Sequence, residues 1–265
     1  MVTRIITGLL AMGSWLLLLY MNSFFLIWLV VTVAAAIGLY EYYTMALGRE
    51  SRVFQSLFFF SGLLPVLASC SGQIKYVAAG LIVGFVVMSS LLIATCSVRQ
   101  NSFDALLKSC FGIFYSGFLP SHLVLIMTFE KGAAWLLFLT IITAASDTGA
   151  YFVGRSLGRH RLCPAVSPNK TVEGFGGGLM AGLAGGTAVA FFLLPGVPLY
   201  RLSLAALVLT CLGVLGDLTE SLIKRAMNVK DSGAILPGHG GILDRIDSLL
   251  MTAPIFFYTL HSGIL

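Results

Sequence analysis

Residues 76–98 have the sequence YVAAGLIVGFVVMSSLLIATCSV, which runs for 23 positions without a charged side chain. An α-helix needs about 20 apolar residues to cross the hydrocarbon core of a bilayer. Because lipid offers the backbone no hydrogen-bonding partner, a segment inside it must satisfy its own N–H and C=O groups, as a helix does. These residues therefore predict a membrane-spanning helix.

The composition of the whole chain points the same way. Hydrophobic residues make up 58% of the 265 residues and charged residues only 10%, whereas a water-soluble domain has about 25% charged residues. The same numbers exclude an intrinsically disordered chain. The five cysteines are scattered and form no CxxC pair, which argues against a disulfide framework and a zinc site. We expect an all-α, polytopic integral membrane protein.

Eight further apolar segments give about nine predicted transmembrane helices. The first could instead be a cleaved signal peptide, but residues 19–22 (LYMN) lack the small residues of a cleavage site, and a second apolar run follows at once. A retained pair of helices is the better interpretation. The predicted spans are 5–20, 23–40, 54–69, 76–98, 109–129, 133–155, 174–195, 203–223 and 248–263.

Charge predicts the orientation of these nine spans. Thirteen of the sixteen Lys and Arg residues fall on the side of the N-terminus, and only Lys75, Lys131 and Arg201 fall on the other. Cytoplasmic loops carry the excess of basic residues, so the N-terminus is expected in the cytoplasm and the C-terminus outside. We divide the chain into an N-terminal region, 1–132, with five predicted helices, and a C-terminal region, 133–265, with cytoplasmic loops 156–173 and 224–247.

The first polar stretch lies at the end of the sixth span. Thr143, Asp147, Tyr151 and Arg155 recur at four-residue spacing and form one stripe on a helix. A carboxylate at that depth usually faces a partner or a water-filled cavity, which indicates a functional Asp147. The alternative is a structural pair between Asp147 and Arg155.

The second polar stretch is the loop before the seventh span. Asn169 and Lys170 lie between Pro168 and the next helix, and we expect both to contribute to a site. The basic residues Arg159 and Arg161 could equally be topology signals. The glycines that begin at Gly174 favour close packing of helices.

The third polar stretch joins the last two spans. Asp217, Glu220, Ser221 and Lys224 follow one another at i, i+3, i+4 and i+7, so they share one face at the cytoplasmic end of a helix. Asp244 and Asp247 share a face at the start of the next helix. Oxygen ligands without a His or Cys cluster suit Mg²⁺, which takes one or two carboxylates together with substrate phosphates.

Basic residues and glycines surround these carboxylates. Lys and Arg side chains suit phosphate oxygens, and glycines let backbone N–H groups approach an anion. Together they are typical of phosphoryl or nucleotidyl transfer, in which catalysis is mostly positioning and neutralisation of charge. His239 could contact phosphate or be structural, whereas His122 and His261 are interpreted as structural. The residues concerned are Lys224, Arg225, Lys230, Arg245, Gly238, Gly240 and Gly241.

The run from Ser221 to Asp247 resembles the signature of the phosphatidate cytidylyltransferase (CDP-diacylglycerol synthase) family, and no fixed position departs from it. Residues 146–151 and 167–174 also resemble family segments, whereas the first half of the chain is similar only in length and hydropathy. The matching positions are Ser221, Lys224, Arg225, Lys230, Asp231, Gly233, Pro237, His239, Gly240, Gly241, Asp244, Arg245 and Asp247.

The resemblance implies that CTP and phosphatidate react to give CDP-diacylglycerol and pyrophosphate, with Mg²⁺ and room for a second cation. It implies Asp217 and Asp244 as metal ligands and a homodimer without a nucleic-acid partner. It also implies that the five helices of region 1–132 face lipid and bind acyl chains, and that region 133–265 is catalytic. The expected location is a bacterial inner membrane, with the site on the cytoplasmic side. The expected catalytic residues are Asp217, Asp244, Lys224 and Asp247. The expected substrate-binding residues are Asp147, Asn169, Lys170, Ser221, Arg225, Lys230, Asp231, His239, Gly240, Gly241 and Arg245.

Two other functions remain open from the sequence. A related CTP-dependent lipid enzyme, either a polyprenol kinase or a cytidylyltransferase for another lipid phosphate, would use the same polar stretches. An ion-coupled transporter with Asp147, Asp217 and Asp244 as ion sites is a different class. The acids lie at the cytoplasmic helix ends rather than at the membrane midplane, and no matching halves are visible, which disfavours the transporter.

Overall fold

The computed structural model describes residues 2–48, 52–94, 102–233, 235 and 240–265. Helices make up most of this part of the chain, as predicted. They are α1 (Val2–Met21), α2 (Phe24–Ala46), α3 (Arg52–Ala68), the 3₁₀ turn η1 (Ser69–Ser71), α4 (Ile74–Ala94), α5 (Ser102–Gly112), the π-helical segment η3 (Ile113–Phe118), α6 (Leu119–Ile126), α7 (Gly132–Leu157), α8 (Val172–Leu193), α9 (Leu199–Ala226) and α10 (Leu243–His261).

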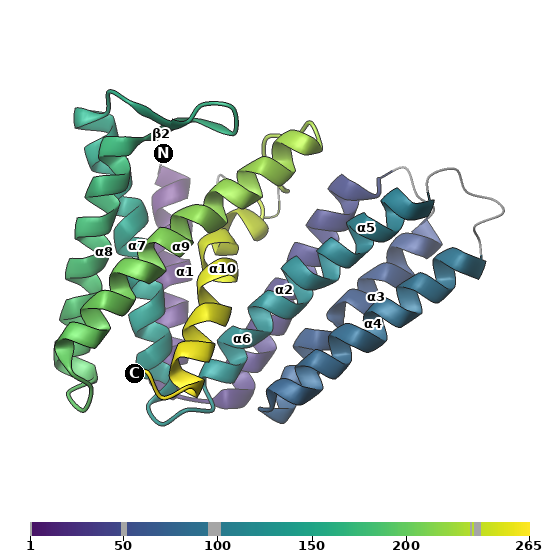
Figure 1. Ribbon diagram of the computed structural model, residues 1–265, viewed down its shortest axis with the longest axis horizontal. Coiled ribbons are helices and arrows are strands. Elements are labelled where there is room, and N and C mark those ends of the chain that lie inside the picture. Colours follow the sequence, from purple (N-terminus) through teal and green to yellow (C-terminus); the bar gives the residue numbers. More distant parts are fainter. Residues whose placement is uncertain (1, 49–51, 95–101, 234, 236–239) are drawn as a thin grey trace.

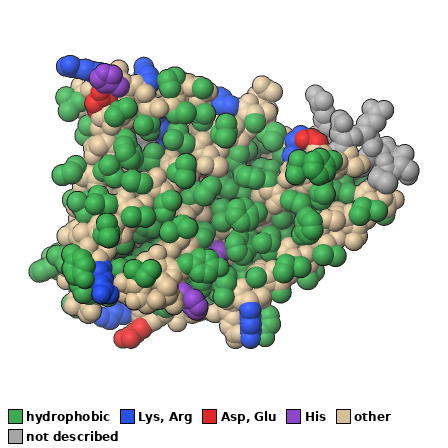
Figure 2. All heavy atoms as spheres, in the orientation of Figure 1, with side chains coloured by type: hydrophobic (Ala, Val, Ile, Leu, Met, Phe, Trp, Pro, Cys, Tyr) green, Lys and Arg blue, Asp and Glu red, His purple; other side chains and the backbone are tan. Residues whose placement is uncertain are grey.

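Seven of the described helical segments are long and apolar enough to cross a membrane; α5, η3 and α6 together count as one, Ser102–Ile126. The other six are α2, Val53–Ser71, α4, α7, α8 and α9. Figure 2 shows apolar side chains over the middle of the visible face and charged side chains towards its upper and lower edges. The chain is therefore an all-α integral membrane protein in its spanning part, whereas nine spans remain a prediction.

The helices form two neighbouring groups (Figure 1). One group holds α2 to α6, and the other holds α1 and α7 to α10. Helix α6 packs against α10 as well as against α2, which joins the groups. The N- and C-termini lie at opposite ends of the helices in this view. The polar end of α9, the start of α10 and the end of α2 lie at the same end of the molecule as the N-terminus.

Several helices extend beyond their predicted spans at this polar end. Helix α2 continues to Ala46 instead of residue 40, α9 continues to Ala226 instead of 223, and α10 begins at Leu243 instead of 248. The hydropathy pattern ends at the first charged residues, but the helices continue through them because charged and polar side chains do not interrupt the backbone hydrogen bonds. The charged residues of the candidate site are therefore mostly carried on helices.

The glycines of α8 pack this helix closely against α7, as predicted from the sequence. Gly174, Gly178, Gly182 and Gly186 recur every four residues on its buried face. A Cβ atom added at Gly178 would lie 3.0 Å from the Ser146 hydroxyl of α7. Small residues at such spacing let two helix backbones approach in a membrane, and this contact fixes the stretch of α7 that carries Asp147.

The loop 156–173 forms a β-hairpin, which the all-α prediction did not include. Strand β1 (Arg161–Cys163) pairs antiparallel with β2 (Ser167–Thr171). The carboxylate of Glu173 accepts hydrogen bonds from the backbone N–H groups of Arg159 and His160, and it lies 2.6 Å from the His160 ring Nδ1. The strands are too short to show an alternating pattern, so local contacts rather than hydropathy define them.

Candidate active site

The end of the hairpin brings Lys170 onto helix α9. Its Nζ lies 2.5 Å from the Asp217 Oδ2, and both side chains are partly exposed. The hydroxyl of Ser221, one turn further along α9, lies 3.5 Å from the other oxygen of Asp217. The short strand β2 thus places a cation beside a carboxylate, and the two predicted site residues meet although 47 positions separate them.

A second cluster lies on the next turn of α9. The Lys224 ammonium is 2.5 Å from Glu220 on its own helix and 2.6 Å from Asp244 on α10. Glu220 is buried, and Asp244 has a side chain only 7% exposed. A buried carboxylate is stable only when it is paired or hydrogen-bonded, and one lysine here serves two of them. Lys224 and Asp244 are therefore in direct contact.

The loop before α10 surrounds the other oxygen of Asp244. This Oδ2 accepts hydrogen bonds from the Ser232 backbone N–H at 3.1 Å, the Ser232 hydroxyl at 3.0 Å and the Gly241 N–H at 2.9 Å. Gly240 has a φ of +80°, and a Cβ there would lie 2.7 Å from the same oxygen. The loop therefore needs glycine at this position both for its backbone conformation and for space.

Asp147 and Asp247 complete an acidic group around Asp217. Their charges interact with that of Asp217, and Lys170 offsets them both. Asp247 is buried and accepts a 2.6 Å hydrogen bond from the Ser248 N–H. A Cβ at Gly216 would lie 2.5 Å from the Asp247 carbonyl oxygen, so this glycine lets α10 approach α9 beside the acids.

The remaining predicted residues lie around this core or outside the described residues. Asn169, Arg225, Lys230, Asp231 and Arg245 are exposed, and Arg245 adds a cationic charge that acts on Asp147. The Arg225 Nε lies 3.5 Å from the Val166 carbonyl oxygen of the hairpin. His239 lies outside the described residues, as do Pro237 and Gly238. The exposed cations are available to an anionic substrate.

Arg155 does not form the structural pair with Asp147 that the sequence left open. It donates a 2.9 Å hydrogen bond to the Tyr151 hydroxyl, one turn away, which leaves Asp147 to the acidic group. His122 is fully buried, and its ring nitrogen Nδ1 contacts the carbonyl oxygens of Phe118 and Leu119. This is the structural role predicted for it.

Two acidic residues at this site had no predicted role. Glu220 belongs to the polar face of α9 that the spacing indicates, but no function was assigned to it. Glu41 on α2 has a relative exposure of 2%, and its carboxylate accepts hydrogen bonds from Ser232, Ile242 and Leu243. The apolar run Tyr42, Tyr43, Met45 and Ala46 after Glu41 is the signal that could have placed this acid inside a helix.

The donor atoms of the site fit a hard cation in their chemistry. In the described part of the chain no group of three or more His, Cys, Asp or Glu is arranged to hold a metal, but Mg²⁺ needs only one or two carboxylates beside substrate phosphates. Among the described residues, the buried oxygens that lack a hydrogen-bond partner include Glu220 Oε1, Ser248 Oγ and Tyr115 Oη. Tyr115 interacts with the charges of Asp217 and Asp247. Unsatisfied buried oxygens in such a place call for an ion, a water or a ligand.

Asp217 and Asp244 differ as candidate ligands. Asp217 is 34% exposed and has one cation beside it, so its carboxylate is open to a bound ion. Asp244 already accepts from Lys224, Ser232 and Gly241, and one of these donors would have to move for it to bind a metal. Their joint role as metal ligands stays a prediction.

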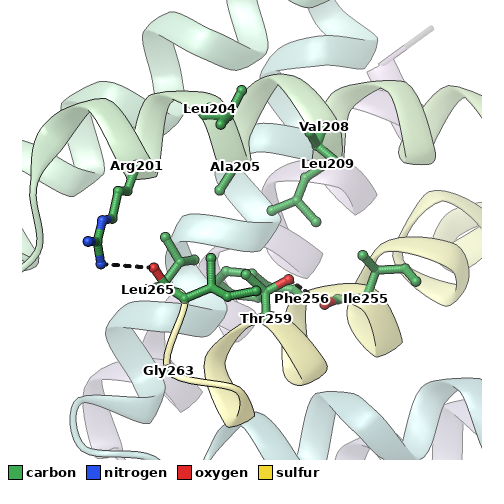
Figure 3. Close-up of a pocket in the computed structure, with 11 residues that line it drawn as sticks. Arg201, Leu204, Ala205, Val208, Leu209, Ile255, Phe256, Thr259, Gly263 and Leu265 are labelled. Atoms are coloured by element: carbon green, nitrogen blue, oxygen red, sulfur yellow. Dashed lines mark hydrogen bonds between the residues drawn. The ribbon is translucent and has the colours of Figure 1, made fainter.

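A cavity of about 530 Å³ at the far ends of α9 and α10 is separate from this site (Figure 3). It is lined mainly by apolar side chains, and Arg201 at its edge donates a hydrogen bond to the Ile264 carbonyl oxygen. Arg201 and Asp217 lie 16 residues apart on one helix, which is about 24 Å along its axis. The cavity therefore contributes nothing to the acidic cluster.

Comparison with known proteins identifies the family. A phosphatidate cytidylyltransferase of Bacillus subtilis (strain 168) is 41% identical over 172 residues, which cover 64% of each chain. One from Staphylococcus saprophyticus is 40% identical over 173 residues, 64% of this chain and 65% of the relative. One from Staphylococcus haemolyticus is 46% identical over 128 residues, 48% and 49% of the two chains. The chain thus spans just under two thirds of the first two relatives. The cytidylyltransferase family model matches residues 2–262, and the protein therefore belongs to the cytidylyltransferase family.

Proposed function

We propose that this protein transfers CMP from CTP to phosphatidate and releases pyrophosphate. The observation that carries the proposal is the meeting of Lys170 with Asp217 and of Lys224 with Asp244 at one end of a membrane helix pair. The relatives from Bacillus and Staphylococcus are named phosphatidate cytidylyltransferases. A polar site at helix ends suits a reaction between a water-soluble nucleotide and a lipid head group.

In the proposed reaction a phosphate oxygen of phosphatidate attacks the α-phosphorus of CTP. A new P–O bond forms, and the bond between the α-phosphorus and the bridging oxygen to the β-phosphate breaks. Pyrophosphate leaves with that electron pair, and CDP-diacylglycerol remains in the membrane. Such a transfer needs little covalent chemistry from the protein, because positioning and neutralisation of charge provide most of the catalysis.

The cations of the site have different proposed roles, depending on how exposed they are. Arg225, Lys230 and Arg245 are exposed and neutralise the triphosphate and the leaving pyrophosphate. Lys224 is held between two carboxylates, which fixes its position relative to the substrate. The proposed pocket is completed by Asp147, Asn169, Lys170, Ser221, Asp231, Asp247, His239, Gly240 and Gly241.

We also propose that Asp217 and Asp244 hold Mg²⁺, with a second cation beside it. The metal, when bound, supplies positive charge that neutralises phosphate oxygens. The partner-free oxygen of Glu220 and the open carboxylate of Asp217 support this assignment. Lys224 would then share the Asp244 carboxylate with the ion or turn towards the substrate phosphates.

The proposed topology has nine spans with a cytoplasmic N-terminus, in a bacterial inner membrane. Thirteen of sixteen basic residues support this orientation, and the two termini lie at opposite ends of the helices. The site then faces the cytoplasm, where CTP is found. A homodimer is part of the proposal, since apolar side chains such as those of Ile82, Val86 and Ile93 on α4 are exposed and available for lipid or a second copy.

The activity is tested by incubating the purified protein with CTP and either phosphatidate or a free polyprenol, followed by mass analysis of the lipids. The proposal predicts a cytidine-containing lipid from phosphatidate and no phosphorylated polyprenol. A polyprenol phosphate without cytidine would instead establish a CTP-dependent kinase. Absence of any lipid product in the presence of Mg²⁺ would contradict both enzymes.

A further inference from the structure

Helix α10 begins without a cap of its own. Its N-cap residue is Ile242, which has no side-chain oxygen to accept a hydrogen bond from the first turn. The first backbone N–H groups of a helix have no partner inside the helix and need one elsewhere. At α10 the partner comes from α2: Glu41 Oε1 accepts from the Ile242 N–H at 3.0 Å, and Oε2 accepts from the Leu243 N–H at 2.9 Å.

The third donor to Glu41 links it to the acidic site. The Ser232 hydroxyl lies 3.2 Å from Glu41 Oε2 and 3.0 Å from Asp244 Oδ2. One hydroxyl carries a single proton, so Ser232 bridges the two carboxylates and cannot donate fully to both. The position of Asp244 is therefore coupled to that of Glu41 through one side chain.

The glycines of the loop leave room for this carboxylate. A Cβ atom at Gly233 would lie 2.6 Å from Glu41 Oε1, and one at Gly241 would lie 2.5 Å from Oε2. Both distances are too short for real carbon–oxygen contacts. The two glycines thus have a structural requirement that is set by a residue about 190 positions earlier in the chain.

Burial of the Glu41 carboxylate costs free energy unless hydrogen bonds offset the loss of solvent. Glu41 is 2% exposed, and its three bonded donors are two backbone N–H groups and a hydroxyl. A buried carboxylate needs hydrogen bonds to offset its desolvation, and the positive end of a helix dipole adds to them. Loss of the acceptor would leave these donors unsatisfied inside the protein.

We propose that Glu41 is a positioning residue, which holds Ser232 and the start of α10 so that Asp244 meets Lys224. It acts on Asp244 through the Ser232 hydroxyl and through the N-terminus of α10. The kinetic part of this inference rests on the proposed cytidylyl transfer. The structural part, that Glu41 holds Ser232 and the start of α10, is independent of the proposed activity.

The test compares wild type with Glu41→Gln, Ser232→Ala and the double variant. Because both side chains act on one loop, each single change should lower kcat/KM for CTP by about tenfold, and the double variant should be no more than about twofold worse than the poorer single variant. Hydrogen exchange of the Ile242 and Leu243 amides should become faster in Glu41→Gln, while exchange in α4 is unchanged. Glu130→Gln removes an equal charge from an exposed position and serves as the control.

Three results would overturn the inference. They are wild-type kcat/KM in Glu41→Gln, unchanged exchange of the two amides, and multiplicative losses of about 100-fold in the double variant. If Glu41→Gln does not fold, Ser232→Ala tests the same bridge alone, and its unchanged kcat/KM would overturn the inference. If wild-type protein forms no CDP-diacylglycerol, the proposed function fails, whereas the amide exchange still decides whether Glu41 holds the loop.

Discussion

Asp244 is the residue through which the two halves of the candidate site are connected. One carboxylate oxygen contacts Lys224, and the other accepts from Ser232 and Gly241. An asparagine at this position has a single acceptor oxygen, and its amide NH₂ would point a donor either at the ammonium or at the loop N–H groups. The site therefore requires a carboxylate here, and a neutral isostere would not replace it.

Asp244→Asn is expected to lower kcat/KM for CTP by roughly 100-fold or more, the size seen when one charge-stabilising group is removed from an active site. Membrane insertion and elution as a folded species should be unchanged. Steady-state kinetics on purified protein measures kcat/KM, and size-exclusion chromatography in detergent shows whether the variant elutes as a folded species. Asp104→Asn is the matched control, because Asp104 forms an exposed pair with Lys108. Activity of Asp244→Asn within threefold of the control would remove Asp244 from the catalytic group.

Sequence spacing predicts part of this residue-level arrangement. Asp217, Ser221 and Lys224 share one helix face, as their i, i+4, i+7 spacing indicates, and Lys170 reaches Asp217 as part of the same predicted site. Glu41 could not be predicted in this role. It lies at the edge of an apolar span, and its partners follow about 190 residues later, so no local pattern connects them.

At the level of elements, the approach of α10 to α9 sets the separation of the acids. Gly216 lies at this contact, where a Cβ would meet the Asp247 carbonyl oxygen at 2.5 Å. Gly213, one turn earlier on the same helix, has no neighbour closer than 3.7 Å to an added Cβ. The two glycines therefore differ in whether the helix pair can accept a methyl group.

Gly216→Ala is expected to push α10 away, to lower the thermal midpoint and to reduce kcat/KM by at least tenfold, a rough figure for a strained helix contact of 1–3 kcal/mol. Gly213→Ala should keep activity and be as stable as wild type or slightly more so, since alanine favours the helix by about 1 kcal/mol. Thermal unfolding in detergent measures the midpoint of each variant, and steady-state kinetics measures its kcat/KM. Equal effects of the two substitutions would contradict the close approach at Gly216.

Hydropathy predicts the helices well but not the elements at their polar ends. The apolar core of each span appears as a helix, and Pro65 does not interrupt α3, which continues to Ala68. The hairpin β1–β2 was missed because its three- and five-residue strands have no periodic pattern. Its shape depends instead on Glu173 and on the contact of Lys170 with α9.

At the scale of the whole molecule, the two natural cysteines Cys70 and Cys163 report on orientation. Cys70 is exposed in the turn between α3 and α4, and Cys163 ends strand β1 of the hairpin. With nine spans and a cytoplasmic N-terminus, these two positions lie on opposite sides of the membrane. Variants that retain one of these two cysteines and lack the other four allow the labelling of each thiol to be measured separately.

A membrane-impermeant thiol reagent added to intact spheroplasts should label the Cys70 variant and leave the Cys163 variant unlabelled until the membrane is permeabilised. The physical reason is the retention of basic loops on the cytoplasmic side. The fraction of labelled protein is read by a mass shift on a gel. Labelling of Cys163 before permeabilisation, with Cys70 protected, would invert the proposed topology.

Composition and charge establish the membrane class of the whole molecule, but they say less about how its two helix groups cooperate. The division at residue 132 remains a prediction. The contact of Glu41 on α2 with Ser232 and Leu243 crosses that division. A cap supplied across the molecule depends on three-dimensional packing, which periodicity within one segment does not encode.

The central claim is that the protein moves the cytidylyl group of CTP, and the fate of a labelled phosphorus tests it most directly. Purified protein is given phosphatidate and CTP labelled at either the α- or the γ-phosphorus. The account predicts that the α-label enters the lipid and that the γ-label is released as pyrophosphate. A γ-label in the lipid, with the α-label left on a soluble nucleotide, would contradict it.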